Sequence, residues 1–501
     1  MNLSKSKYCR GIQCPKMLWM DSYKPELFDQ SVIDETRFIT GNEVGDLAMA
    51  YFGNYIEVEY SQDFSAMIAK TQELIAANTP IITEATFAFN GDLCMVDILR
   101  QVDGAYEIIE VKSSSNSLSD GLSKIKEIYF HDMAYQIYIL TNCGLNITKV
   151  FLMQLNSDYV FQDELLIDEL FVLTDCSEEV FATQGTILGN IKQIKNTVAS
   201  PDEPKCLIGS RCDSPYTCGY KKWCYKDLPI DNVFTIGWRM SSNMKDKLYQ
   251  AAIVSFTDVL NARSKLTDKQ YRQIITTLND LPPEIDKAAI AEFLDQIKYP
   301  LYFLDFETFQ QVIPKYKGIK PYSQIPFQYS LHIQKEKGGP LQHKEFLAEA
   351  GEDPRRALAE SLCRDIPTDV CIIAYNMAFE KSRIKELANH FPDMKYHLMA
   401  LYDNFVDLAL PFGSGAYYCK PMAGSYSIKA VLPALCPNDP QLDYGSLQLI
   451  HNGSEAMAAY ANLHLQSPEV SAETRQALLA YCRLDTLAMV KILEKLYDCL
   501  L

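Results

Sequence analysis

The strongest constraint on the fold of this chain is a run of strand signals over residues 81–112 that carries acidic side chains. The segment is predicted to form three strands, with Asn90-Gly91 as a tight hairpin turn. The third strand ends in Glu110-Val111-Lys112. Because alternate residues of a strand share a face, Glu110 and Lys112 are expected to point the same way, with Asp97 of the neighbouring strand within reach. The predicted strands are residues 81–89, 93–99 and 106–111.

Two carboxylates and a lysine at one point suit hydrolysis of a phosphodiester bond assisted by a divalent ion. Asp97 and Glu110 offer the hard oxygen ligands that Mg²⁺ prefers. Lys112 is expected to orient the attacking water or to stabilise the charge that develops on the phosphate. A Glu-x-Lys on a strand is common by itself, so this hypothesis depends on the hairpin and on Asp97.

Asp97 followed by Glu110-x-Lys112 resembles the PD-(D/E)XK nuclease motif. The next helical segment resembles the glutamine-bearing motif of the RecB-type branch, with Gln136 and Tyr138 at the matching positions. The resemblance implies a mixed sheet with flanking helices, Mg²⁺ or Mn²⁺ bound by Asp97 and Glu110, and a catalytic contribution from Gln136.

One motif of that branch differs in this chain. RecB-type enzymes often carry an earlier Gly-x-x-Val-His whose histidine binds metal, and here the segment from Gly41 places Gly45 at the histidine position. The metal site then either lacks one ligand or receives it from Glu43, Asp46 or Glu84.

The cysteines divide into scattered and clustered ones. A reducing cytosol argues against a disulfide framework for the 15 cysteines of this chain. The scattered ones, in apolar runs, are predicted to be small buried hydrophobic residues. These include Cys94, Cys143, Cys371 and Cys482.

Three cysteines recur at equal spacing, as Cys212-x5-Cys218-x5-Cys224. Soft thiolate ligands of this kind suit an iron–sulfur cluster or tetrahedral zinc. Cys14, in Cys-Pro-x-x-Leu-Trp, resembles the first cluster cysteine of RecB-type iron–sulfur nucleases, in which one cysteine precedes the nuclease core and three follow it. The resemblance implies a [4Fe–4S] cluster on these four residues. Zinc is the alternative metal, and Cys9 and Cys206 are alternative fourth ligands.

Residues 191–228 hold seven basic and four acidic residues, interleaved with aromatic ones. Charge and stacking of this kind are typical of a path for single-stranded nucleic acid. A solvated surface with aromatic side chains packed beneath it fits the same pattern.

A second acidic pattern opens the C-terminal part of the chain. Residues 301–306 form an apolar strand, and Asp305 and Glu307 are expected on one face of it, near its end. Buried carboxylates are costly unless they bind cations or form structural ion pairs. Both interpretations fit the strand alone.

The order of three motifs favours a cation site. Asp305-x-Glu307 resembles the first motif of DnaQ-type (DEDD) exonucleases, which have an RNase H-like fold. Asn376-Met-Ala-Phe379-Glu380 resembles the second motif, with Glu380 in place of an aspartate, and Tyr481 four residues before Asp485 resembles the third. The resemblance implies that Asp305, Glu307 and Asp485 share two divalent ions. Glu380 would complete the set, and Tyr481 would position the water.

Residues 424–433 are predicted to form a loop and helix that line this second site. Lys429 is then available to a phosphate, and Asp407 is a spare carboxylate.

Composition is compatible with a nuclease. Lys+Arg 47 against Asp+Glu 64 gives a net charge of −17, which excludes a basic protein that coats nucleic acid. We find no apolar run long enough to span a membrane and no signal-peptide pattern at the N-terminus, so a cytoplasmic protein without membrane partners is expected.

The predicted fold class is α/β, in three parts. Residues 1–228 form a RecB-type nuclease-like domain, 229–298 a helical linker region, and 299–501 a DnaQ-type exonuclease-like domain. The combination resembles a bacterial family that joins these two halves. The predicted function is a metal-dependent nuclease acting on DNA, on single strands or ends, with 3′–5′ exonuclease activity in the C-terminal half, in repair or defence. The alternatives are a catalytically decayed, metal-stapled nucleic-acid-binding protein and an RNA-directed exonuclease.

Overall fold

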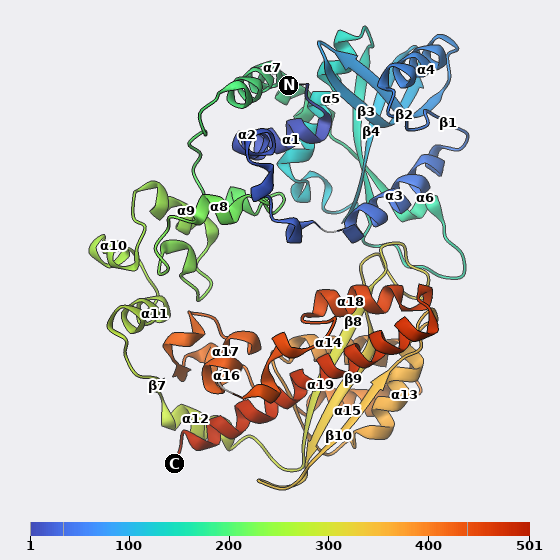
Figure 1. Ribbon diagram of the computed structural model, residues 1–501. Helices are drawn as coiled ribbons and strands as arrows, with labels where there is room; N and C mark the ends of the chain where they lie inside the picture. Colours follow the sequence, from blue (N-terminus) through green and yellow to red (C-terminus); the bar gives the residue numbers. More distant parts are fainter. Residues whose placement is uncertain (1, 34, 438) are drawn as a thin grey trace. The chain divides into compact units, whose positions relative to one another are not determined.

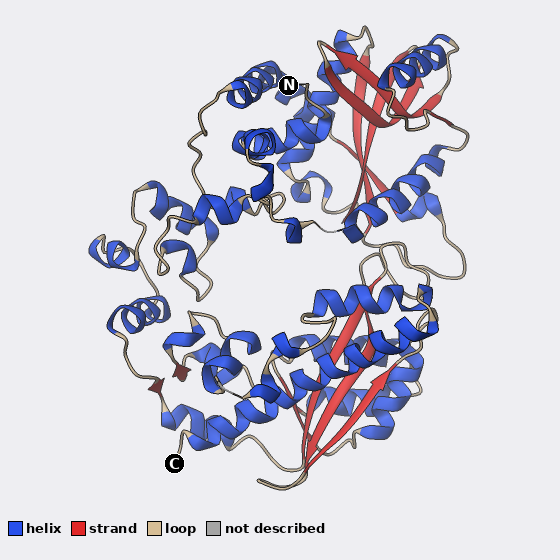
Figure 2. Cartoon of the chain, viewed as in Figure 1, coloured by secondary structure: helices blue, strands red, loops and turns tan. Residues whose placement is uncertain are grey.

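The computed structural model describes residues 2–33, 35–437 and 439–501 and has the predicted mixed α/β class. The chain divides into two compact units. The first unit comprises Met1–Leu228 and Val312–Pro321, and the second comprises Pro229–Gln311 and Tyr322–Leu501. Figure 2 shows that each unit contains one large sheet with helices around it.

The first unit is built on a six-stranded mixed sheet in the order β1-β2-β3-β4-β5-β6. The predicted hairpin joins β2 to β3, and β4 follows antiparallel to β3 and parallel to β5. The strands are β1 (Ile56–Glu57), β2 (Ile81–Phe89), β3 (Asp92–Val102), β4 (Ala105–Asn116), β5 (Ile147–Asn156) and β6 (Phe171–Asp175).

The main helix of this unit, α5, packs on β2 and β3, and α1 and α7 pack on α5 (Figure 1). Helix α3 packs on β3 and β4, and α4 on β2. The helices are α1 (Lys5–Gln13), α2 (Pro15–Tyr23), α3 (Glu35–Met49), α4 (Phe64–Ala76), α5 (Glu127–Asn142), α6 (Ile167–Leu170), α7 (Ser177–Ala199) and α8 (Lys221–Tyr225).

The second unit is built on a five-stranded sheet in the order β10-β9-β8-β11-β12. β8, β11 and β12 are parallel, and β9 is antiparallel to both of its neighbours. The strands are β8 (Leu301–Gln310), β9 (Gln324–Gln334), β10 (Leu341–Leu347), β11 (Cys371–Ala374) and β12 (Phe405–Asp407), with a separate pair β7 (Glu284–Ile285) and β13 (Tyr417–Tyr418).

The long C-terminal helix α19 packs along β8 and β9, and α18 packs on β8 (Figure 1). Helix α13 packs on β9 and α14 on β8 and β9. The helices are α9 (Ser242–Gln250), α10 (Phe256–Asn261), α11 (Asp268–Asn279), α12 (Lys287–Leu294), α13 (Arg355–Asp365), α14 (Ala378–His390), α15 (Lys395–Asp403), α16 (Leu410–Ser414), α17 (Ile428–Leu435), α18 (Gly453–Asn462) and α19 (Pro468–Asp498).

Residues 229–298, predicted as a helical linker region, belong to the second unit. The main chain of Trp238 donates a 2.9 Å hydrogen bond to the carbonyl of Gly424, and its indole stacks on Tyr426. Gly237 permits this approach, since a Cβ atom there would lie 2.1 Å from the Gly424 oxygen. The region therefore contributes to the packing of the second unit.

Two expected boundaries differ from the structure. Strand β8 continues to Gln310, so Asp305 and Glu307 lie within the strand and not at its end. The additional residues of β8 pair with β9, which satisfies their main-chain hydrogen bonds. A register shift after Glu307 marks a β-bulge. The apolar residues of 473–501 recur at helical spacing and predict a last helix that begins at Glu473. The helix instead begins at Pro468, because the side chain of Ser467 caps it by accepting a hydrogen bond from the main-chain N–H of Val470.

Across the described ranges, the helices are all too short or too polar to cross a membrane.

Candidate functional sites: two carboxylate centres and a cysteine cavity

The predicted acidic residues of the first unit meet on three neighbouring strands. Strand pairing places Glu84 of β2, Asp97 of β3 and Glu110 of β4 side by side. One oxygen of Asp97 accepts a 2.7 Å hydrogen bond from the main-chain N–H of Val111. The Glu110 side chain is fully buried. We call this group the first centre, together with the four residues described next: Lys5, Lys112, Asp132 and Gln136.

Lys112 and Gln136 both contact Glu110. Lys112 Nζ lies 2.5 Å from Glu110 Oε1 and 2.9 Å from Asp132 Oδ2. Gln136 Nε2 on α5 donates a 2.7 Å hydrogen bond to the other oxygen of Glu110. Tyr138, the second matching position of the RecB-type motif, instead packs its ring edge against Phe89 in the core.

Lys5, the first residue of α1, is part of the first centre. It was not predicted as a site residue from the sequence. Its ammonium lies 3.0 Å from both oxygens of Glu110 and 3.2 Å from Asp97 Oδ1. It therefore stands between the two carboxylates that were predicted to hold a divalent ion. The partners are 92 and 105 positions away, and no local pattern links such distant residues.

The charged groups of the first centre shift one another's pKa values. Burial raises the pKa of Glu110, but Lys112 and Lys5 outweigh it and hold that pKa well below its usual range. Burial and then the charge of Asp97 raise the pKa of Glu84 to about 7. Burial and then Glu110 also raise the pKa values of Asp97 and Asp132. Two lysines thus compensate only part of the negative charge of four carboxylates.

Of the three residues considered as replacements for the missing histidine, Glu84 is the one that interacts with Asp97. Glu43 and Asp46 are exposed on α3. A Cβ atom at Gly45 would meet nothing within 4 Å, so the helix has room for a side chain there.

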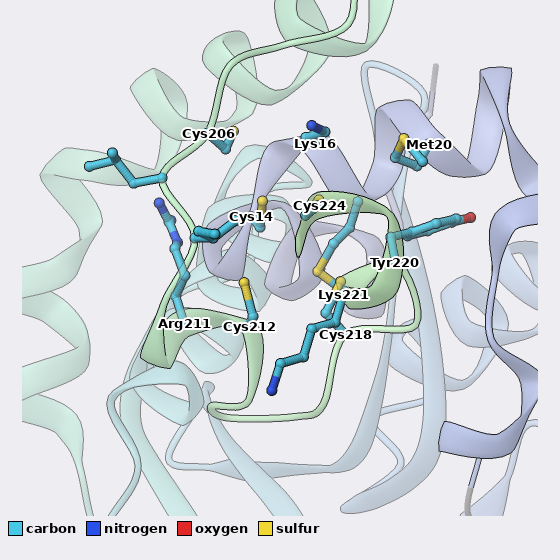
Figure 3. A pocket seen from close by; sticks show the side chains of 13 residues that line it. Cys14, Lys16, Met20, Cys206, Arg211, Cys212, Cys218, Tyr220, Lys221 and Cys224 are labelled. Atoms are coloured by element: carbon cyan, nitrogen blue, oxygen red, sulfur yellow. The ribbon is translucent and has the colours of Figure 1, made fainter. Parts of the chain in front are cut away.

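The four predicted cluster cysteines line one cavity, together with Cys206 (Figure 3). Cys14 is the residue between α1 and α2, where the N-terminal segment reaches residues that lie about 200 positions later. The main-chain N–H of Cys218 donates a 2.8 Å hydrogen bond to the carbonyl of Cys212, which closes the ligand loop. The thiols of Cys14, Cys212, Cys218 and Cys224 lie close enough to affect one another's ionisation.

The cysteine cavity has donor chemistry suited to a thiophilic metal. A hydrogen bond with Cys14 lowers the pKa of the Cys206 thiol to about 6, so a thiolate is available near neutral pH. Cys9, the other alternative ligand, interacts instead with Asp132 and Lys112 of the first centre and does not line the cavity.

Thiolate ligands suit both of the metals expected from the sequence. The donor chemistry of the cavity is therefore compatible with zinc and with an iron–sulfur cluster.

Most basic residues of 191–228 already have partners. Lys195 pairs with Asp92, and Lys221 pairs with Asp213. The Trp223 ring lies beneath the ammonium of Lys226, at 3.1 Å from the ring centre. These contacts favour a solvated surface with packed aromatic residues over an open path for a nucleic-acid strand.

The scattered cysteines include one correction. Cys143, predicted as a buried hydrophobic residue, is exposed at the C-terminal end of α5. The apolar run before it is a largely buried helix whose last buried residue is Leu140, and Cys143 is the cap residue just after that helix. Cys94 and Cys482 are buried, and Cys371 is partly buried.

The DnaQ-like motifs converge in the second unit. Asp305 and Glu307 lie on β8, Glu380 in the first turn of α14, and Asp485 on α19. Burial and then the charges of Asp485, Glu307 and Glu380 raise the pKa of Asp305 well above its usual value. Burial and then Asp485 do the same for Glu307. We call these four carboxylates the second centre.

The pKa values of Glu380 and Asp485 are also raised. Burial raises the pKa of Glu380 to about 8, with a further contribution from Asp407. Burial raises the pKa of Asp485 to about 6, and hydrogen bonds from Tyr444 and Tyr481 limit the rise. One oxygen of Glu380 is buried without a hydrogen-bond partner in the described structure. Buried carboxylates at this density are costly unless a cation compensates their charge.

Asp407, predicted as a spare carboxylate, holds the backbone of the second motif. Its Oδ1 accepts hydrogen bonds from the main-chain N–H groups of Asn376 (2.8 Å) and Ala409 (2.9 Å). Asn376 has a φ of 65°, a left-handed conformation that asparagine tolerates. Asp407 thereby fixes the turn that leads into α14 and Glu380.

The segment after residue 424 supplies the wall of the second centre. Lys429 Nζ lies 5.7 Å from the ring centre of Tyr444 and 5.9 Å from that of Tyr481. The Tyr444 hydroxyl donates a 2.5 Å hydrogen bond to Asp485. Tyr444 was not predicted as a site residue. It lies 41 positions before Asp485 and belongs to none of the three motifs recognised in the sequence.

Comparison with known proteins gives two matches. Residues 302–427 match a family described as "Domain of unknown function (DUF2779)". The match includes Asp305, Glu307 and Glu380 and ends before Tyr481 and Asp485.

The chain is also 25% identical over 213 residues to "Uncharacterized protein MG366 homolog" of Mycoplasma pneumoniae. The alignment covers 39% of this chain and 32% of the relative, so the chain spans about a third of that protein's length. Neither description names an activity.

Proposed function

We propose that this chain is a metal-dependent nuclease acting on DNA, on single strands or ends, with 3′–5′ exonuclease activity at the second centre. The observation that carries the proposal is the gathering of Asp305, Glu307, Glu380 and Asp485 at one point from elements up to 180 positions apart. Within the described residues, none of the four forms a salt bridge with a lysine or arginine side chain. Lys429 and Arg383 compensate part of their charge from a distance, and bound cations would compensate the rest.

The chain supplies distinct roles at this centre. Bound Mg²⁺ or Mn²⁺ would supply Lewis-acid stabilisation and a more acidic water. Asp305, Glu307 and Asp485 provide the oxygen ligands, and Glu380 completes the set. The Tyr481 hydroxyl stands beside Asp485 and is suited to orient the attacking water. Lys429, whose charge acts on Glu307 and Asp485, is suited to receive a phosphate of the strand.

The first centre supports a second hydrolytic site of the PD-(D/E)XK kind, with Asp97 and Glu110 as ligands and Lys112 and Gln136 beside them. Two observations favour a second function for it. Lys5 already stands between Asp97 and Glu110, and Gly45 supplies no ligand. The alternative is that this half binds nucleic acid without cutting it.

We further propose that the cysteine cavity holds a [4Fe–4S] cluster on Cys14, Cys212, Cys218 and Cys224. The support is the set of soft donors that line one cavity and the lowered pKa of the Cys206 thiol beside Cys14. A cluster there would tie the N-terminal segment to the end of the first unit. The setting we propose is DNA repair or defence in the cytoplasm, from the resemblance stated above.

The test uses the purified full-length chain with Mg²⁺ or Mn²⁺ and end-labelled single-stranded DNA and RNA. Asp305→Ala is expected to abolish shortening from the 3′ end, and Lys112→Ala any cleavage by the first centre. Asp403→Asn, on the exposed end of α15, and Lys149→Ala, half-exposed on β5, are matched controls. Strand binding without cleavage in the wild-type protein would support the nucleic-acid-binding alternative. Cleavage of RNA alone would support the RNA-directed one.

A further inference from the structure

Cys482 lies inside the second centre and was predicted only as a buried hydrophobic residue. It follows Tyr481 on α19 and has no exposed surface. Its Sγ lies 3.6 Å from Asp305 Oδ2 and 3.7 Å from the Asp305 carbonyl oxygen. The sulfur and one carboxylate oxygen from each of Asp305 and Glu307 all lie within 4.8 Å of one another. Among the described histidine, cysteine and acidic residues, this is the one group of three with such spacing.

The separation of sulfur and oxygen matches metal coordination. An ion in tetrahedral geometry, about 2.1 Å from an oxygen and about 2.3 Å from a sulfur, holds the two ligand atoms about 3.6 Å apart. Cys482 Sγ and Asp305 Oδ2 have this separation. In the metal-free chain the thiol donates a weak hydrogen bond to Asp305 across this distance, and metal coordination would replace that bond without moving either atom far.

A second observation points to a cation at the same place. Glu380 is 4% exposed, and its Oε2 has no hydrogen-bond partner in the described structure. Its charge acts on both Asp305 and Glu307. A buried carboxylate oxygen without a partner is costly, and a bound cation would remove that cost.

We propose that Cys482 is a metal ligand of the second centre and makes this centre prefer a borderline-soft divalent ion such as Zn²⁺ over Mg²⁺. Thiolates select zinc and related ions, whereas Mg²⁺ takes oxygen ligands and gives up its waters reluctantly. The proposal rests on the second centre being the cation site of the proposed function. It concerns which ion that site takes.

Coordination changes the protonation of the thiol. As the sulfur–metal bond forms, the thiol proton passes to solvent, because a coordinated thiol is deprotonated. Without a metal, burial and then the charges of Asp305 and Glu307 raise the pKa of Cys482 well above its usual value. The free thiol is therefore neutral and unreactive, which argues against a redox role.

The test is titration of the metal-stripped full-length chain with Cd²⁺, a spectroscopic probe for zinc-like sites, without oxygen. Wild type is compared with Cys482→Ser and Cys482→Ala, and Cys419→Ser is the control for another buried cysteine of the second unit. The charge-transfer absorption between thiolate and Cd²⁺ is recorded as the difference between each variant and the wild-type protein. The cysteines of the first unit contribute equally to both spectra, so their contribution cancels. Thermal melting followed by circular dichroism checks that each variant is folded. If the buried serine hydroxyl of Cys482→Ser unfolds the protein, Cys482→Ala tests the same loss of sulfur with an apolar side chain.

Both Cys482 variants should lose one thiolate–cadmium absorption step and roughly tenfold or more in Cd²⁺ affinity. Their Mg²⁺ affinity should not fall, and Cys419→Ser should match wild type. If both variants bind Cd²⁺ like wild type while Asp305→Asn does not, the carboxylates hold the ion alone. That result overturns the role of Cys482 and leaves the proposed function standing. If Asp305→Asn also binds every ion like wild type, the cation site itself is rejected.

Discussion

The hydroxyl of Tyr444 donates a 2.5 Å hydrogen bond to Oδ1 of Asp485, across 41 positions of the chain. The bond opposes the effect of burial on Asp485, whose pKa still rises to about 6. Tyr444 therefore keeps Asp485 ionised near neutral pH, which is the form that binds a cation. A tyrosine outside the recognised motifs thus sets the charge of a motif residue.

Tyr444→Phe should raise the pKa of Asp485 further, so that more of it is protonated near pH 7. Mn²⁺ affinity should fall roughly tenfold near neutral pH and recover as the pH rises. Calorimetric titration at several pH values measures this. Tyr460→Phe, whose hydroxyl bonds to the Glu349 carbonyl, is the control. An unchanged pH dependence in Tyr444→Phe would count against this role.

The metal-free chain should lose stability as the pH rises. The pKa of Glu380 is raised from 4.5 to about 8, so between these values the folded state keeps a proton that the unfolded state has lost. The contribution of Glu380 to the free energy of unfolding is then largest below about pH 4.5. It falls by a few kcal/mol by about pH 8. Asp485 and Glu84 act in the same direction.

Thermal melting with a chelator, across this pH range, checks that expectation. Glu380→Gln should flatten the decline, since the amide does not ionise, and Glu473→Gln, exposed on α19, should not. Adding Mn²⁺ should raise the melting temperature most at the upper end of the range. A melting temperature that rises steadily toward pH 8 without metal would contradict the pKa pattern.

Lys5→Met should have opposite effects with and without divalent ions. Without them, loss of the ammonium leaves Asp97 and Glu110 under-compensated and should cost about 2 kcal/mol, less than a fully buried pair because Lys5 is partly exposed. With Mn²⁺, the first centre should bind the ion more tightly and recover that stability. Melting with and without Mn²⁺ measures both. Lys7→Met, exposed two positions further along α1, should change neither.

Cys218→Ser should release the metal of the cysteine cavity and lower the melting temperature of the first unit. Cys218 is buried in the ligand loop, so its loss removes a ligand and a packing group together. Iron, sulfide and zinc content, with the brown colour of an iron–sulfur protein, distinguish the two metals. Cys143→Ser, an exposed cysteine, is the control. Full metal content in Cys218→Ser would exclude that cysteine as a ligand.

Much of the local structure could be predicted from the sequence. The hairpin signal at Asn90-Gly91 and the strand patterns of residues 81–112 located β2, β3 and β4, because turn chemistry and strand alternation are local properties. Alternation also predicted that Glu110 and Lys112 share a face. The α/β class followed from the same patterns and is confirmed.

Contacts between distant segments could not be predicted in this way. Lys5 follows a short polar N-terminal stretch, and nothing local shows that its ammonium reaches Glu110. Tyr444 and Cys482 acquire their roles only when α19 packs on β8. Residues 229–298 were predicted as a helical linker region from their pattern of helix and loop, yet Trp238 in this region bonds to the loop at Gly424.

Helix α1 carries Lys5 at its first residue and is followed directly by Cys14. Nine helical residues extend about 14 Å and behave as a stiff rod over that length. One end of the rod places an ammonium between Asp97 and Glu110, and the other end places a sulfur in the cysteine cavity. A shift of Cys14 on gain or loss of the proposed metal would therefore be transmitted mechanically to Asp97 and Glu110.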